Sequence, residues 1–91
     1  MHTDELGTTW VHVSGVPHTL RHFLGLWAVG SLIGKTLDVD LLALRRRNVI
    51  HIKVAMRDVG MFATRVVKSD TFLPLKGYTF CFDKEAVDFV P

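Results

Sequence analysis

Two short segments of the chain alternate strictly between apolar and polar side chains. They are Val11–Ser14 and Ile50–Val54, within the predicted strands Trp10–Ser14 and Ile50–Met56. An alternation with a period of two is typical of a β-strand that buries one face. In each segment the aliphatic residues fall on one face, and a histidine, His12 or His51, falls on the other. The pattern therefore predicts two strands, each of which places a histidine on the face away from the core.

The apolar positions between residues 20 and 33 recur at helical spacing and cover most of the circumference of the predicted helix. We expect its N-cap at His18 or Thr19. Gly25 and Gly30 each cost a helix interior about 1 kcal/mol relative to alanine, so a backbone or a large side chain should pack closely against both. One apolar stripe is enough for a helix of a small domain, but this helix has a second. The second stripe consists of Leu26, Val29 and Ile33. It belongs either to the core or to an interface with another subunit.

Four further elements complete the predicted fold. They are a strand over Thr36–Leu44, a polar hairpin turn over Arg45–Asn48, a short helix over Val59–Lys68 capped by Asp58, and a last strand over Tyr78–Asp83. The element order is β-α-β-β-α-β. With right-handed crossovers it predicts an α+β, ferredoxin-like sandwich, in which a four-stranded antiparallel sheet of order 4-1-3-2 carries both helices on one face. We expect this domain to span residues 9–85, between a flexible segment of residues 1–8 and a tail of residues 86–91.

Composition narrows the class of protein. The 91 residues fit one domain, and the net charge of +2 permits contact with a polyanion without requiring it. The single cysteine, Cys81, cannot form an internal disulfide, which predicts a reducing, intracellular location in the nucleus or cytoplasm. The longest apolar segment, residues 20–33, is too short and too interrupted to span a bilayer, so no membrane partner is expected.

Both histidine-bearing segments resemble sequence signatures of the RNA-recognition-motif superfamily. Val11–Val16 resembles its first-strand signature, and Arg47–Val54 lies where its third-strand signature begins with a basic residue. Three signature positions that carry aromatic rings in that superfamily are occupied here by His12, Val49 and His51. The resemblance implies an RNA-recognition-motif-like fold whose sheet binds single-stranded nucleic acid.

A second resemblance covers nearly the whole chain, from Trp10 to Glu85. It is carried by Trp10–Pro17, Leu26–Gly34, Val39–Asp40 and Tyr78–Phe82, of which Leu26–Gly34 is the most specific piece. These segments resemble a plant domain family of undescribed function that is similar to the nucleic-acid-binding domain of retrotransposon-derived, gag-like proteins. Members often precede a CCHC zinc knuckle, and no such knuckle lies within these residues. The resemblance implies a grass-type plant source and a gag-like role.

The predicted nucleic-acid site combines the sheet face with the basic turn. Its residues are His12, Val49, His51 and Lys53 on the sheet and Arg45, Arg46 and Arg47 in the turn. Imidazole rings can stack on bases, and arginines can hold the phosphates of a single strand. Two alternatives stay open for this face, which are an ordinary solvated surface and burial against another chain.

Neither a catalytic site nor a metal site is expected. Ser14 has no base beside it, and Gly30–Thr36 ends like a phosphate-binding loop but follows a helix and precedes a strand, the reverse of the order that such a loop needs. A partial zinc set of His12, His51 and Cys81 lacks a fourth ligand. The sequence therefore predicts a non-enzymatic module, without cofactor, that binds single-stranded RNA or DNA in a transposon-derived plant protein. The alternative is a protein-interaction or homodimerisation domain that uses the stripe of Leu26, Val29 and Ile33.

Overall fold

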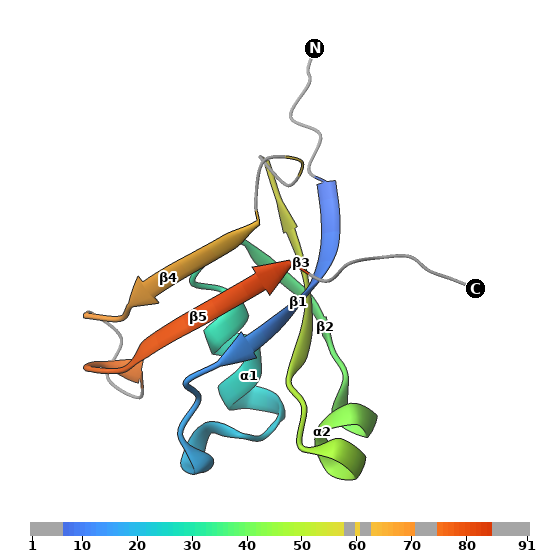
Figure 1. Ribbon diagram of the computed structural model, residues 1–91, viewed down its shortest axis with the longest axis vertical. Coiled ribbons are helices and arrows are strands. Elements are labelled where there is room, and N and C mark those ends of the chain that lie inside the picture. Colours follow the sequence, from blue (N-terminus) through green and yellow to red (C-terminus); the bar gives the residue numbers. More distant parts are fainter. Residues whose placement is uncertain (1–6, 58–59, 61–62, 71–74, 85–91) are drawn as a thin grey trace.

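The structure is an antiparallel sheet wrapped around one helix (Figure 1). A computed structural model describes residues 7–57, 60, 63–70 and 75–84. Along the chain the elements are β1 (Gly7–Ser14), η1 (His18–Leu20), α1 (Phe23–Gly30), β2 (Lys35–Val39), α2 (Leu41–Arg47), β3 (His51–Met56), β4 (Thr64–Lys68) and β5 (Thr79–Lys84). The α+β class predicted from the sequence is confirmed.

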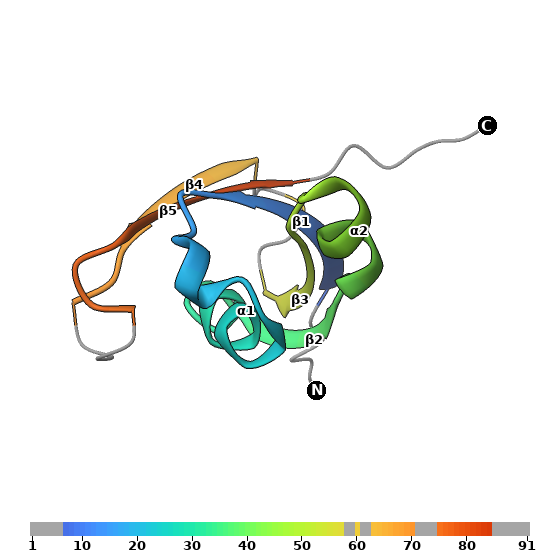
Figure 2. The ribbon, with the colours of Figure 1, turned by 90° about the horizontal axis from the view of Figure 1, so that it is seen from below.

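The sheet has five strands in the order β2-β3-β1-β5-β4, and each strand is antiparallel to its neighbours. Figure 2 shows the sheet curving around α1, which lies on its concave side. The predicted neighbours of β1, namely β3 and the last strand, are correct, but the predicted strand count and order are wrong because β4 extends the sheet beyond β5. The helices do not share a face either: α2 lies at the end of β2 and β3 (Figure 1).

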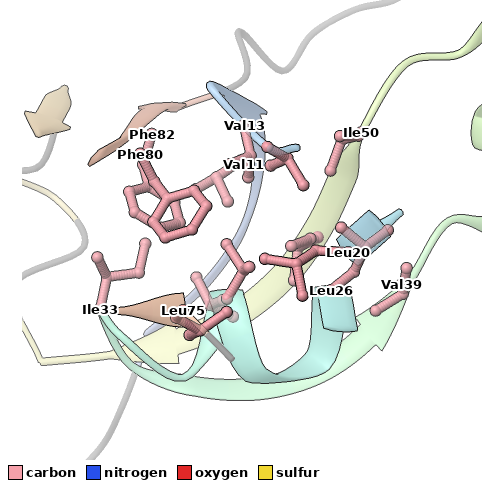
Figure 3. Close-up of a cluster of buried hydrophobic side chains, with 14 of the residues drawn as sticks. Val11, Val13, Leu20, Leu26, Ile33, Val39, Ile50, Leu75, Phe80 and Phe82 are labelled. Carbon is pink, nitrogen blue, oxygen red and sulfur yellow. The ribbon is translucent and has the colours of Figure 1, made fainter. Parts of the chain in front are cut away.

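The core lies between α1 and the concave face of the sheet. Figure 3 shows the side chains of Val11, Val13, Phe80 and Phe82 pointing from β1 and β5 toward Leu26 of α1. Leu26, Val29 and Ile33 are all buried in this cluster. The second apolar stripe of the helix therefore belongs to the core, and these residues cannot form the subunit interface that was left open as an alternative.

The two helical glycines sit where the chain packs most closely, as predicted. A Cβ atom at Gly30 would lie 2.5 Å from the Thr36 hydroxyl and 2.9 Å from a methyl group of Ile52. At Gly25 it would collide with the backbone carbonyl of Leu20. Both positions therefore need a residue without a side chain, so that α1 can approach β2, β3 and the preceding turn.

Helix α1 begins later than predicted. The predicted caps, His18 and Thr19, lie in the short 3-10 turn η1, and α1 starts at Phe23. His22 is the N-cap, since its backbone is extended and its Nδ1 accepts a hydrogen bond from the backbone N–H of Gly25 at 3.2 Å. An acceptor side chain at this position satisfies one of the unpaired donors of the first helical turn.

The predicted strand over Thr36–Leu44 is wrong in its second half. Strand β2 ends at Val39, and α2 follows directly. Asp40 caps α2, because its carboxylate accepts a hydrogen bond from the backbone N–H of Ala43 at 3.0 Å. Leucine, alanine and arginine are strong helix formers, and Asn48 ends the helix in the left-handed conformation with a φ of 55°. Arg45, Arg46 and Arg47 therefore form the last turn of a helix instead of a hairpin turn.

The predicted helix over Val59–Lys68 is also wrong where the structure describes it. Thr64–Lys68 forms β4, which pairs with β5 along its whole length. Threonine and two adjacent valines favour an extended backbone because their branched side chains pack well on a pleated surface. The proposed cap at Asp58 and the tail over residues 86–91 lie outside the described residues. Near the N-terminus of the chain, β1 already begins at Gly7, inside the segment of residues 1–8 that was predicted to be flexible.

Candidate nucleic-acid interface

The candidate site occupies the face of the sheet opposite α1, which we call the open face. Alternation along β1, β3 and β5 places half-buried and exposed side chains on it, and the intervening residues are buried on the α1 side. The open face carries Trp10, His12, Ser14, His51, Lys53, Thr79, Cys81 and Asp83. For His12, His51 and Lys53 this placement agrees with the prediction made from the alternation of the sequence.

Two cross-strand pairs form the centre of the open face. His12 lies opposite His51, and Trp10 lies opposite Lys53, in the register of β1 and β3. The two imidazole rings meet edge to face, with ring centroids 5.9 Å apart and an angle of 74° between their planes. Since adjacent positions of one face are within reach of each other's side chains, the four residues make one continuous surface of three rings and an ammonium group.

Acidic residues border this surface on both sides. Asp38 of β2 lies opposite Lys53, and Asp83 of β5 lies opposite His12. One carboxylate oxygen of Asp83 accepts a hydrogen bond from the hydroxyl of Thr64 at 2.9 Å. These carboxylates limit the positive potential of the open face, so it offers rings and hydrogen-bonding groups more than charge.

Trp10 is a functional candidate that the predicted binding set did not include. Its indole is the largest ring on the open face, and among the described residues of that face there is no other tryptophan, tyrosine or phenylalanine. The ring of Tyr78, by contrast, lies tilted against the ring of Phe80, which is buried on the α1 side of the sheet, with ring centroids 6.4 Å apart. The sequence was sufficient to predict this position, because Trp10 lies two residues before His12 and therefore on the same face of the strand.

The three arginines form the last turn of α2, the helix that joins β2 to β3. The backbone N–H of Asp40 donates to the carbonyl of His51 at 3.0 Å, which fixes the start of α2 beside the histidine pair. Arg45, Arg46 and Arg47 are all exposed. A shallow hollow of about 250 Å³ runs along α2 and is lined by Asp40, Leu42, Ala43, Arg46 and Arg47. The hollow has two guanidinium groups and one carboxylate, and that carboxylate already caps the helix.

Val49 lies outside strand β3 and is the weakest member of the predicted set. Its backbone N–H donates to the carbonyl of Ala43 at 3.3 Å, so it belongs to the segment that returns from α2. Its side chain is half-buried. The structure thus brings together His12, His51 and Lys53, places the three arginines in the last turn of α2, and leaves Val49 at the junction between α2 and β3.

The described part of the chain supports neither a metal site nor a phosphate-binding loop. The Sγ atom of Cys81 lies 4.0 Å from a carboxylate oxygen of Asp83, and the described residues hold no group of three or more metal-ligating side chains. The Gly30–Thr36 segment runs from α1 into β2, the reverse of a phosphate-binding loop. The hydroxyl of Thr36 is used structurally, because it donates to the carbonyl of Trp27 at 2.8 Å.

Comparisons of the chain with protein-family models, with curated proteins and with solved structures give no match. No helix in the described residues is long and apolar enough to cross a membrane. The class defined by fold and site is an α+β domain whose sheet presents rings on one face and whose second helix ends in three exposed arginines.

Proposed function

We propose that this chain is a non-catalytic module that binds single-stranded RNA or DNA on the open face of its sheet. The observation that carries the proposal is the adjacency of Trp10, His12, His51 and Lys53 on that face, together with the three exposed arginines in the last turn of α2. The resemblance of the sequence to transposon-derived plant proteins supports the same function. We also propose that this chain is part of such a protein.

The mechanism follows from the chemistry of these groups. An unpaired base can stack on the indole of Trp10, and a neighbouring base can stack on an imidazole of the histidine pair. Lys53 and the arginines of α2 would hold the phosphates on either side of the stacked bases. A duplex keeps its bases stacked on each other and hides their faces from such a surface, so single strands are the preferred ligand.

An NMR titration of the domain with short mixed-sequence RNA and DNA tests this function. We expect the shift changes to concentrate on Trp10, His12, His51 and Lys53 and on α2, and to weaken with added salt. A duplex of the same sequence serves as the matched control and should bind more weakly. The proposal fails if single strands cause no shifts at low salt, or if the shifts map to the α1 side of the molecule.

One observation favours a second candidate, a protein-interaction or homodimerisation domain. Helix α1 exposes Leu24 by 72% and Phe23 by 42%, and the ring of Phe23 packs on Trp27 with centroids 5.3 Å apart. Exposed apolar groups of this size can mark a protein interface. Sedimentation at increasing concentration tests the homodimer: association that is lost in Leu24→Glu supports it, and a monomer throughout the concentration range contradicts it.

A further inference from the structure

Strand β4 forms one edge of the sheet, and its hydrogen bonds fix which of its backbone groups point outward (Figure 1). The Ser69 N–H donates to the carbonyl of Tyr78 at 3.0 Å, and the Lys84 N–H donates to the carbonyl of Ala63 at 2.9 Å. In an antiparallel pair the residues that bond to the neighbouring strand alternate with residues that bond away from it. Residues 63, 65, 67 and 69 therefore bond to β5, and Thr64, Val66 and Lys68 direct their N–H and C=O groups to the outer edge of β4.

The outer edge of β4 is regular and accessible. The strand pairs with β5 without a register shift from Thr64 to Lys68, and in the described residues no strand pairs with its other side. Val66 is 63% exposed. The opposite edge of the sheet differs, because β2 has a register shift between Thr36 and Asp38 and leads directly into α2. Bulges protect an edge from pairing, whereas a straight, β-branched strand is a template for another extended chain.

The charge of β4 indicates the chemistry of its partner. Arg65 and Lys68 are the charged residues of the strand, and they lie on opposite faces of the sheet because their positions differ in parity. A strand added beside β4 would place its own side chains next to Lys68 on one face and next to Arg65, which already has an interaction within the chain, on the other. Acidic side chains on the added strand would therefore be favourable, above all beside Lys68. A second copy of β4 would instead bring two more cations to the same edge, which disfavours self-pairing.

From this geometry we propose that the outer edge of β4 binds an extended, acidic segment of a protein partner, which it adds to the sheet as a further strand. This interaction is independent of the proposed nucleic-acid function, because it uses backbone groups of Thr64, Val66 and Lys68 and none of the open-face rings or α2 arginines. The partner would be recognised by main-chain hydrogen bonds, with glutamate or aspartate side chains supplying selectivity.

Amide hydrogen exchange of the unmodified domain is the direct test. The probe is a short capped peptide of threonine, valine and glutamate with glutamates on both faces, and the control peptide has lysine at each glutamate position. We expect the acidic peptide to slow exchange at the amides of Thr64, Val66 and Lys68, while the amides of Arg65 and Val67 change less because they already pair with β5. The inference is overturned if these three amides stay unprotected at millimolar peptide, or if the lysine peptide protects them equally.

A pair of variants separates edge pairing from general charge attraction. Val66→Pro removes an outward N–H, and proline is tolerated at an edge strand position whose N–H faces away from the sheet. Val66→Thr keeps that N–H and serves as the matched control. We expect Val66→Pro to weaken acidic-peptide binding at least about tenfold, and Val66→Thr to bind like the original. Equal affinity of the two variants would contradict the inference.

The two proposals fail separately. Replacing all three arginines of α2 by alanine should weaken single-strand binding and leave peptide binding unchanged, and Val66→Pro should do the opposite. If the acidic peptide competes with single-stranded RNA for the open face, the peptide binds as a polyanion, and the edge-pairing inference is overturned while the nucleic-acid proposal stands.

Discussion

At the scale of single residues, the most specific prediction concerns the indole of Trp10. Stacking of one base on an aromatic side chain contributes about 1–3 kcal/mol to single-strand binding, so Trp10→Ala should lower affinity for RNA or DNA about tenfold or more. Trp10→Phe keeps a ring and should retain most of the affinity. Fluorescence anisotropy with a labelled oligonucleotide measures both variants, and circular dichroism checks that they fold. An unchanged affinity of Trp10→Ala would remove the stacking platform from the proposed mechanism.

Two buried hydroxyl groups allow a matched test of polar burial. Ser69 is 3% exposed, and its hydroxyl has no hydrogen-bond partner among the described residues, whereas the buried Thr36 hydroxyl donates to Trp27. An unsatisfied buried group costs free energy, and a satisfied one contributes about 1 kcal/mol. We therefore expect Ser69→Ala to raise the free energy of unfolding and Thr36→Val to lower it. Urea denaturation measures both changes, and a loss of stability in Ser69→Ala would mean that its hydroxyl has a partner.

At the scale of elements, α2 depends on the two residues that end it. Asp40 caps its first turn through the Ala43 N–H, and Asn48 adopts the left-handed conformation at its last. Loss of an N-cap acceptor costs about 1 kcal/mol, so Asp40→Ala should lower the free energy of unfolding by that amount. Asp40→Ser keeps an acceptor and should lose much less. Equal losses in the two variants, measured by thermal or chemical denaturation, would show that the cap contributes nothing to stability.

The same elements explain how far the sequence could predict the fold and the site. Alternation identified β1, β3 and β5 and the open face, because a half-buried strand repeats every second residue whatever its partners are. It failed at Leu41–Leu44, where a continuous apolar run fits a buried strand as well as a helix, and the Asp40 cap favours the helix. It failed again at Thr64–Lys68, since an edge strand owes its conformation to pairing with β5, which lies more than ten residues away in the sequence. Trp10 was left out of the predicted site because the site residues were chosen from family signatures, and not from which residues share a strand face with His12.

At the scale of the whole molecule, the balance of charge decides how strongly a polyanion can bind. The net charge is only +2, and carboxylates border the open face, so much of the positive potential comes from Arg45, Arg46 and Arg47. Replacing all three by alanine reverses the sign of the net charge. These residues are exposed, and stability should therefore change little, because exposed charges contribute little to folding.

The salt dependence of binding measures this contribution directly. Each phosphate contact to a single strand adds about 0.7 to the slope of log affinity against log salt concentration, so the triple alanine variant should lose a slope of up to about 2 if each arginine holds one phosphate. Replacement of all three by lysine preserves the charge and should preserve the slope, although affinity falls if the guanidinium groups hold phosphates in a bidentate manner. A triple alanine variant with the original slope would place the phosphates elsewhere, and the single strand would then cross the open face without reaching α2.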